Sequence, residues 1–375
     1  MTDLVVVSLE AWDGVWRRNQ HLVWRLLQRD PTLRVLFVEP PADPLHDLRS
    51  RQMPRFGADL DDQAMSGRLW TFRPVKALPR RVDRRADDRI AAQICRAAEQ
   101  LGMDAPILWV NDPLGAELAR RTGWRTLYDI TDDWLAADRA DTHRARISEA
   151  EHWLLSHSRT VVACSAELVR RKSAGRPSDM PPIALIPNAV DVAAYCSPQP
   201  RPSDLPTERV ALYAGTLHSD RLDVPLCVET AHRVRGSGTL VLIGPNALTG
   251  PDTAALRAAG ARLLGARPHE ELIGYLQHAD VLLVPHLVND FTESLDPIKL
   301  YEYLAVGRPI VSTPVAGFRD TSIPALRCAA PASFAEAVVA QWARSAEHHA
   351  PTAVKDWSVR AGAFAEVLAQ TQSDS

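Results

Sequence analysis

The segment Phe291–Pro314 reads FTESLDPIKLYEYLAVGRPIVSTP and is the most informative part of the second half of the chain. Its pattern predicts a loop, a helix, a tight turn and a strand, directly after an earlier apolar strand. Asp296 suits the N-cap, Pro297 suits the first helical position, and Gly307 suits the left-handed residue that ends a helix. The pattern therefore predicts a helix over Pro297–Val306.

The beginning of this helix, at Pro297, Ile298 and Lys299, is a candidate anion site. Free N–H groups and a partial positive charge at the carboxyl ends of parallel strands suit a diphosphate. Glu302 lies one turn further on the same face, so Lys299 suits a phosphate and Glu302 suits ribose hydroxyls. The structural alternative is a surface ion pair between them. Only four of the 43 lysine and arginine residues are lysine, which favours a functional role for Lys299.

Outward from this segment, short β-branched or leucine-rich runs alternate with helix-like stretches, the pattern of βα units on parallel sheets. A chain of 375 residues exceeds one hydrophobic core, so two domains are expected. A proline-rich polar linker follows the IPNAVD turn (Ile186–Asp191). The expected domains are therefore residues 1–193 and 194–355. The expected strands lie at 4–9, 35–39, 69–73, 107–111, 125–129, 160–164 and 183–186, then at 209–214, 239–243, 261–264, 281–285 and 310–313.

Composition narrows the class of protein. A net charge of −3 with 24% charged residues is that of an ordinary globular protein and predicts no nucleic-acid partner. The five cysteines form no CxxC pair, which predicts reduced thiols and no structural metal site. We find no signal peptide and no run long enough to cross a bilayer. The expected location is the cytoplasm, with peripheral contact at the inner face of the membrane left open; nothing indicates the oligomeric state.

The helix segment also contains the signature PxKxxEYxAxGxPxV. In this respect the chain resembles the GT-B glycosyltransferases of family 4 (glycosyl transferases group 1), particularly bacterial members. Further stretches match in the same order. These are RRNQHLVWRLL (Arg17–Leu27), YDITDDW (Tyr128–Trp134), IPNAVD, LYAGTL (Leu212–Leu217) and the stretch Leu263–Pro285. The resemblance implies an α/β fold of the GT-B type, with two Rossmann-like parallel-sheet domains facing across a cleft. It also implies that the C-terminal helix at 356–375 completes the first domain.

Such enzymes transfer a hexosyl-type sugar with retention of configuration and without a metal or other cofactor. The resemblance thus implies a nucleoside-diphosphate sugar of the UDP or GDP type as donor, bound by the second domain. It also implies that the sugar is transferred to a hydroxyl of the acceptor, which would be a glycan, a lipid-linked molecule or a small natural product. In the family a basic pair in a GRLxxxK pattern grips the diphosphate. The glycine of this pattern corresponds to Gly215 here and its last basic residue to Arg221, while Thr216 replaces the expected arginine. Arg221 and Lys299 would then stabilise the leaving diphosphate; an ordinary surface role for Arg221 is the alternative.

The family's paired glutamates are altered in this chain. Ser294 stands at the position of the first glutamate, and Glu293 is its neighbour. Either Glu293 binds the donor sugar, or backbone amides near Leu295–Ile298 do so.

In the first domain, Gly14 either lets the backbone approach the donor phosphates or is a plain turn glycine. Asp132 is the expected catalytic carboxylate, which would orient an acceptor hydroxyl or stabilise charge on the sugar. Neighbouring carboxylates and indoles, which stack on sugar rings, are expected to bind the acceptor. These residues are Trp12, Trp16, Asp129, Asp133 and Trp134. Helix capping by the aspartates and core packing by the tryptophans are the alternatives.

Three rival functions fit parts of the sequence. Asp59–Asp61 matches the DxD motif of metal-dependent glycosyltransferases, but it follows no apolar strand. A sugar-nucleotide epimerase would keep the same fold. A non-catalytic sugar-nucleotide-binding subunit would explain the altered Thr216 and Ser294.

Overall fold

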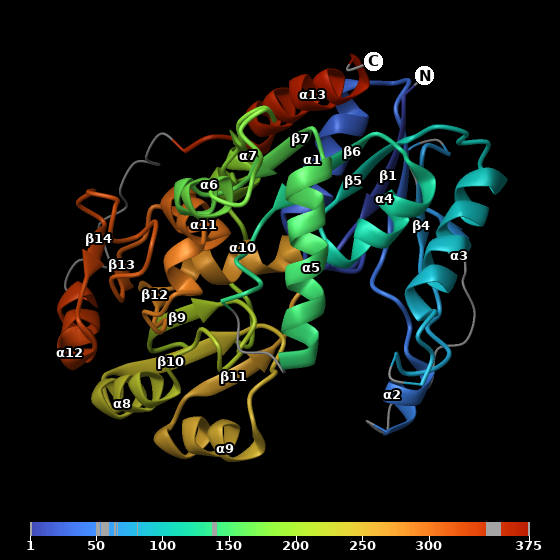
Figure 1. Ribbon diagram of the computed structural model, residues 1–375. Helices are drawn as coiled ribbons and strands as arrows, with labels where there is room; N and C mark the ends of the chain where they lie inside the picture. Colours follow the sequence, from blue (N-terminus) through green and yellow to red (C-terminus); the bar gives the residue numbers. More distant parts are fainter. Residues whose placement is uncertain are drawn as a thin grey trace. The chain divides into compact units, whose positions relative to one another are not determined.

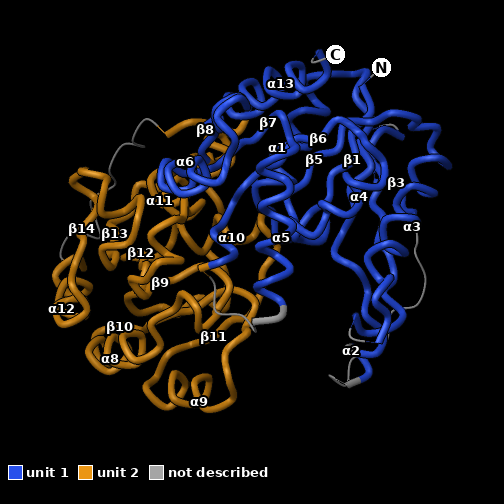
Figure 2. The backbone as a smooth tube through the Cα atoms, in the orientation of Figure 1, with its two compact units in different colours: residues 1–135, 139–187, 358–375 blue, residues 136–138, 188–357 orange. Residues whose placement is uncertain are grey.

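The computed structural model describes residues 2–49, 53, 60–63, 65, 67–80, 82–136, 141–342 and 354–373 (Figure 1). The backbone separates into two compact units, coloured separately in Figure 2. Unit 1 is built from residues up to 187 together with 358–373, and unit 2 mainly from 188–357. The change of unit after Pro187 lies inside the IPNAVD turn, before the linker where we expected it. The reason is that the Asn188 backbone and side chain both bond to Asp296 of unit 2.

Unit 1 contains an eight-stranded sheet with strand order β3-β4-β2-β1-β5-β6-β7-β8. The strands are β1 (Asp3–Val7), β2 (Arg34–Val38), β3 (Leu60–Asp62), β4 (Leu69–Phe72), β5 (Ile107–Val110), β6 (Thr126–Ile130), β7 (Thr160–Ala163) and β8 (Ala184–Leu185). All neighbours pair in parallel except β3, which is antiparallel to β4. The predicted strands are present. β3 is an addition, because its short acidic sequence carries no strand pattern. It contains Asp61 of the DxD match, whereas Asp59 lies outside the described residues.

Helices cover this sheet and enclose its core. They are α1 (Arg18–Arg29), α2 (Pro44–Arg49), α3 (Ala86–Gln100), α4 (Ala116–Thr122), α5 (Asp141–His157), α6 (Ala166–Ser173) and α13 (Trp357–Ser373). A short 3₁₀ helix, η1 (Pro113–Gly115), precedes α4. From residue 358 onward α13 belongs to unit 1, where Phe364 packs on Trp109 with ring centres 4.3 Å apart. The C-terminal segment thus supplies part of the unit 1 core.

Unit 2 contains a six-stranded, wholly parallel sheet with strand order β11-β10-β9-β12-β13-β14. The strands are β9 (Arg209–Ala214), β10 (Gly238–Ile243), β11 (Arg262–Gly265), β12 (Val281–Val284), β13 (Ile310–Ser312) and β14 (Leu326–Cys328). The helices are α7 (Val192–Cys196), α8 (Val224–Val234), α9 (Gly250–Ala259), α10 (His269–His278), α11 (Ile298–Val306) and α12 (Pro331–Gln341), with the 3₁₀ helix η2 (Thr292–Ser294). Apolar cores fill both faces of the sheet. Only the edge strand β14 was not predicted.

Parallel strands bring all their carboxyl ends to one edge of a sheet, and loops at that edge carry most binding residues in such folds. Apart from Asp129, which lies near the carboxyl end of β6 itself, the candidate residues of each unit lie in these loops or in the helices that follow them. No helix that the structure describes is both long and apolar enough to cross a membrane.

Candidate functional site

Helix α11 in unit 2 begins one residue later than predicted. Its first helical residue is Ile298, and Pro297 takes the N-cap position with extended backbone (φ −72°, ψ 120°). Asp296 does not cap the helix, because its carboxylate accepts hydrogen bonds from the Asn188 backbone N–H (2.5 Å) and the Tyr301 hydroxyl (2.7 Å). The predicted cap is therefore wrong. Asp296 instead ties the start of α11 to the turn that opens unit 2.

Lys299 lies against the glycine that follows β9. Gly215 has a φ of 149°, and a Cβ atom there would lie 2.5 Å from both Cε and Nζ of Lys299. Gly244, directly after β10, is equally constrained, because its Cβ would overlap the Gly215 carbonyl oxygen. Glycine alone tolerates both the backbone angle and the close approach. The two glycines therefore let the ammonium group lie against the backbone at the carboxyl end of β9.

Lys299 is half-buried, and its ammonium group lies in positive, poorly solvated surroundings. Burial, reinforced by the nearby Arg221 guanidinium, lowers the pKa of Lys299 to about 8 from an ordinary value of 10.5. Arg221 is partly exposed, pairs with Asp220 (3.2 Å) and lies 5.3 Å from the centre of the Phe291 ring. Thr216 contributes its carbonyl oxygen, which accepts a 3.4 Å hydrogen bond from the Tyr213 hydroxyl. Two cations thus gather where an anionic ligand would offset their repulsion.

Glu302 lies further along α11 and is nearly buried. Its carboxylate accepts a 2.6 Å hydrogen bond from the hydroxyl of Tyr195, on α7. Among the described residues no ion pair within 4.0 Å joins Lys299 to Glu302, although the Glu302 carboxylate partly offsets the lowering of the Lys299 pKa. A carboxylate can accept several hydrogen bonds, so the Tyr195 contact leaves Glu302 able to accept more.

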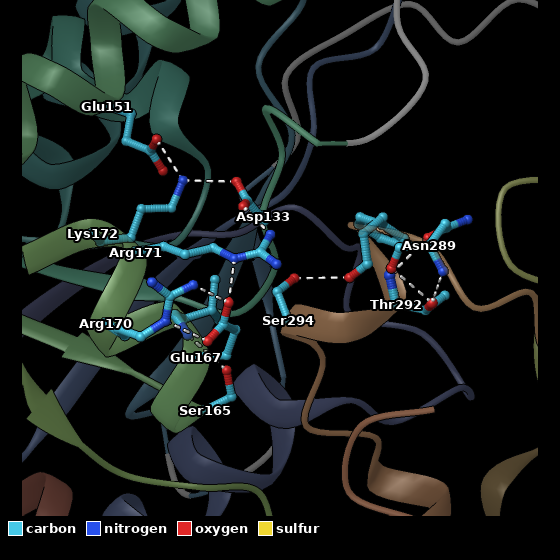
Figure 3. A network of polar contacts seen from close by, with 12 residues as sticks. Asp133, Glu151, Ser165, Glu167, Arg170, Arg171, Lys172, Asn289, Thr292 and Ser294 are labelled. Atoms are coloured by element: carbon cyan, nitrogen blue, oxygen red, sulfur yellow. Dashed lines mark hydrogen bonds and ion pairs between the residues drawn. The ribbon is translucent and has the colours of Figure 1, made fainter. Parts of the chain in front are cut away.

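The altered first-glutamate position lies on η2. Glu293 faces Arg319 in a two-pronged ion pair, with its carboxylate oxygens 3.0 and 2.9 Å from one guanidinium nitrogen. Ser294 is buried, and its hydroxyl donates to the Phe291 carbonyl oxygen at 2.8 Å (Figure 3). Arg319 therefore neutralises the carboxylate of Glu293, while Leu295 links η2 to the start of α11.

In unit 1, Asp129 is an internal counter-ion. Both its carboxylate oxygens accept from the Arg18 guanidinium, each at 3.1 Å, and both side chains are buried. Arg18 is the first residue of α1, and Asp129 lies in β6. The pair therefore fixes the start of α1 to the carboxyl end of the sheet. This geometry favours a positioning role over the expected direct contact with an acceptor.

Asp133 is held in a second network, which links the loop after β6 to two helices (Figure 3). The buried Lys172 ammonium on α6 bonds to Asp133 and to Glu151 on α5, each at 2.8 Å. Arg171 adds a 3.1 Å contact to Asp133. Although burial opposes it, these two cations hold the pKa of Asp133 below its ordinary value. Asp133 thus fastens the loop that carries Asp132.

Asp132 is partly exposed and lies near a carboxylate that the sequence did not reveal. Burial, reinforced by Asp132 and opposed by Arg17, raises the pKa of Glu10 to about 7. The Asn19 side-chain amide donates to Glu10 (3.4 Å) and to the Ser8 hydroxyl (3.1 Å). Glu10 lies three residues beyond the end of β1, and that position is the one signal that could have identified it.

The remaining first-domain candidates lie in the two loops at the same edge of unit 1. Gly14 is exposed in the loop after β1. Trp12 and Trp16 are half-buried with ring centres 5.9 Å apart, and Trp12 packs edge-on against Phe37 at 5.0 Å. Trp134 is half-buried beside Asp133. The indoles therefore combine packing with an exposed face, and the structure leaves both expected roles open to them.

The family match of the chain lies in unit 2. Residues 208–343 match the family described as glycosyl transferases group 1. The chain is also 21% identical over 222 residues to a putative teichuronic acid biosynthesis glycosyltransferase, TuaH, of Bacillus subtilis. That match covers 55% of this chain and 55% of TuaH, so the chain spans about half the length of this relative. Lys299, Glu302, Gly215 and Arg221 all lie inside the matched family segment.

Solved structures match nearly the whole chain. Sucrose-phosphate synthase from Thermosynechococcus elongatus superimposes with a TM-score of 0.66 and 18% identity, covering 99% of this chain and 98% of that one. The fold is GT-B. The Anabaena protein HepE, in complex with UDP and glucose, gives a TM-score of 0.65 and 14% identity, covering 98% and 100% of the two chains. At these identities the likeness establishes the GT-B architecture alone.

Proposed function

We propose that this chain is a glycosyltransferase that moves a sugar from a nucleoside-diphosphate sugar to an acceptor hydroxyl. The observation that carries the proposal is the placement of Lys299 against Gly215 at the start of α11, with Arg221 nearby. A desolvated ammonium beside a second cation is costly without an anion. A diphosphate bound there would supply that anion, and the family match to unit 2 supports the same assignment.

In the proposed reaction, charge develops on the diphosphate as the bond to the sugar breaks. Lys299 and Arg221 are fixed donors that would stabilise this charge, a contribution that can reach several kcal/mol when water is excluded. Glu302, oriented by Tyr195, would accept hydrogen bonds from the ribose hydroxyls. The proposal includes retention of configuration and independence from metal ions. UDP is the first nucleotide to test, because HepE was solved with UDP.

We place the acceptor in unit 1. A recess at the carboxyl ends of β1, β2 and β5, with a cavity volume of about 50 Å³, is lined by the apolar Ile90 and Leu118 and by the polar Glu39 and Asp112. Asp132 and the half-buried Trp12 are further acceptor candidates at this edge. The name of the Bacillus relative supports a glycan as the acceptor class.

The proposal includes a cytoplasmic location with contact to a membrane surface. Exposed large apolar side chains occur on α2 and in the segment after Val75, a residue that forms a bridge with Ala42 shortly before α2. They are Leu45, Leu48, Leu78 and Val82. Co-sedimentation with vesicles containing anionic lipid tests this contact. We expect binding that is lost on Leu48→Ser with Val82→Ser, and retention in the supernatant of the native chain would contradict it.

The first test of the donor site is thermal stabilisation by UDP, GDP and ADP in the presence of a chelator. A ligand at 100 times its dissociation constant stabilises the native state by about 2.7 kcal/mol, which raises the melting temperature. We expect one nucleotide to do so, and Lys299→Ala and Glu302→Ala to abolish the shift. Lys355→Ala, which removes an exposed lysine, is the matched control. Absence of any shift, with or without magnesium, would contradict the proposal.

Turnover separates the rival functions. A glycosyltransferase requires an acceptor, whereas an epimerase would convert the sugar nucleotide alone. Donor binding without turnover across a broad acceptor panel would indicate a binding subunit.

A further inference from the structure

Beneath Lys299 lies a buried tyrosine whose ring faces the ammonium group. The Lys299 Nζ is 5.3 Å from the centre of the Tyr213 ring, a distance at which the electron-rich face attracts a cation. Tyr213 is fully buried near the end of β9, two residues before Gly215. The Tyr213 Oη would also lie 3.1 Å from a Cβ at Gly215, so it contributes to the crowding around this glycine. The tyrosine thus forms one wall of the space that holds the lysine.

The orientation of Tyr213 is fixed by a histidine at the end of the neighbouring strand. The Tyr213 Oη and the His286 Nε2 are 3.1 Å apart, and a hydroxyl can donate or accept, so they bond in either tautomer of the histidine. His286 is itself fixed, because its backbone N–H donates to Thr313 Oγ1 (3.2 Å) and its carbonyl accepts from the same hydroxyl (2.7 Å). A rigid series of contacts therefore runs from β13 through His286 to the ring under Lys299.

His286 also avoids adding a third positive charge to the site. Burial, reinforced by Lys299 and Arg221, lowers the pKa of His286 well below its ordinary value, so the ring is neutral. A neutral imidazole can hold the tyrosine hydroxyl without repelling the ammonium group. The titratable groups around Lys299 are then Tyr213 from β9, Arg221 from the loop after it, His286 after β12 and Glu302 from α11.

We propose that Tyr213 and His286 are positioning residues, which hold the Lys299 ammonium where it contacts the diphosphate of the donor. This inference rests on the proposed function, and it assigns to two buried core residues a part in donor affinity. The alternative explanation is that both side chains only fill the core of unit 2. The two explanations differ in one measurable respect. A positioning residue acts through Lys299, so its effect on diphosphate binding must vanish when Lys299 is absent.

A double-mutant cycle tests this, with calorimetric titration of UDP and of inorganic pyrophosphate in chelator. Tyr213→Leu removes the ring, and we expect binding of both ligands to weaken about 5- to 30-fold, the range for a desolvated cation–π contact. Tyr213→Phe and His286→Gln keep the ring and should weaken binding about 2- to 10-fold. In the Lys299→Ala background, Tyr213→Leu should change binding by no more than about twofold.

Tyr128→Leu is the matched control, since Tyr128 is likewise buried in a parallel strand with a bonded hydroxyl, but in unit 1. It should leave affinity unchanged, and the conservative Tyr213→Phe keeps the test valid if Tyr213→Leu does not fold. Additive effects of Tyr213 and Lys299 variants would overturn the positioning role while leaving the donor site intact. Failure of the native chain to bind UDP or pyrophosphate would overturn the proposed function itself.

Discussion

Two lysines near the carboxyl edges of the two sheets have opposite electrostatic surroundings. In unit 1 the buried lysine, Lys172, is enclosed by two carboxylates at 2.8 Å. In unit 2 the half-buried Lys299, in the first turn of α11, has an arginine nearby, an aromatic ring beneath it and a lowered pKa. A buried charge that is paired with opposite charges helps to hold the fold together. A poorly solvated charge with like charge beside it gains from binding a ligand of opposite charge. The same residue type therefore serves structure in one unit and, as we propose, donor binding in the other.

The largest expected effect is on the stability of unit 1. Lys172→Met removes the cation between Asp133 and Glu151 and leaves buried carboxylates facing each other, which should cost about 3–5 kcal/mol. Urea unfolding followed by tryptophan fluorescence suits the measurement, because eight of the ten tryptophans precede residue 160. Lys76→Met, at a partly exposed pair with Asp43, is the control and should cost less than about 1 kcal/mol. Equal losses of unfolding free energy in the two variants would contradict the structural role of Lys172.

Lys299→Met should behave in the opposite way, with binding lost and stability kept. We expect nucleoside-diphosphate affinity to fall about 10- to 150-fold, the range for a hydrogen bond to a charged group. Urea unfolding at pH 7 should show no loss of stability, because the folded state disfavours the charge. As pH rises above 8, the native lysine loses its proton in the folded state first, so the native chain gains stability relative to the variant. A destabilised variant would show that Lys299 is a structural residue.

Glu10 should give unit 1 a pH dependence of its own. Its folded pKa of about 7 lies above the ordinary 4.5, so the folded chain holds a proton that the unfolded chain releases. Stability contributed by this group is therefore present below pH 4.5 and is lost as pH rises to 7, by at most about 1.4 kcal/mol per pH unit. Urea midpoints of the native chain and Glu10→Gln, compared between pH 4.5 and 8, check this. Parallel curves would exclude the raised pKa.

The smallest expected effect concerns the exposed pair on η2. Arg319→Ala removes the partner of Glu293, but both side chains are substantially exposed, at 45% and 27%. We expect a change of less than about 1 kcal/mol in the free energy of unfolding, and that change should vanish in high salt. A larger, salt-independent cost would mean that the pair fixes the loop before α11 and would weaken the distinction between exposed and buried charges.

Much of the fold was predictable because its signals are local. Short apolar runs separated by helix-like stretches identify the central strands of both sheets, and Gly307 correctly ends α11 with a φ of 72°. The strands β3 and β14 escaped prediction, since each is three residues long and neither sequence, LDD nor LRC, is a continuous apolar run. The prediction that Asp296 caps α11 was wrong for a related reason. Its suitability as a cap is local, but the Asn188 amide that claims its carboxylate lies 108 residues away.

The sequence by itself predicted most strands and helices, because apolar periodicity and glycine placement are local signals. Motif and spacing made Lys299 and Glu302 candidates, and the family resemblance added Gly215. Only folding settled how these charges are paired. Asp129 and Asp133 stand in the same YDITDDW stretch as Asp132, and the folded chain places Arg18 against Asp129 and Lys172 against Asp133. Ion pairing and desolvation depend on partners brought together only by folding. For that reason Glu10, Tyr213 and His286 became visible only in the folded chain.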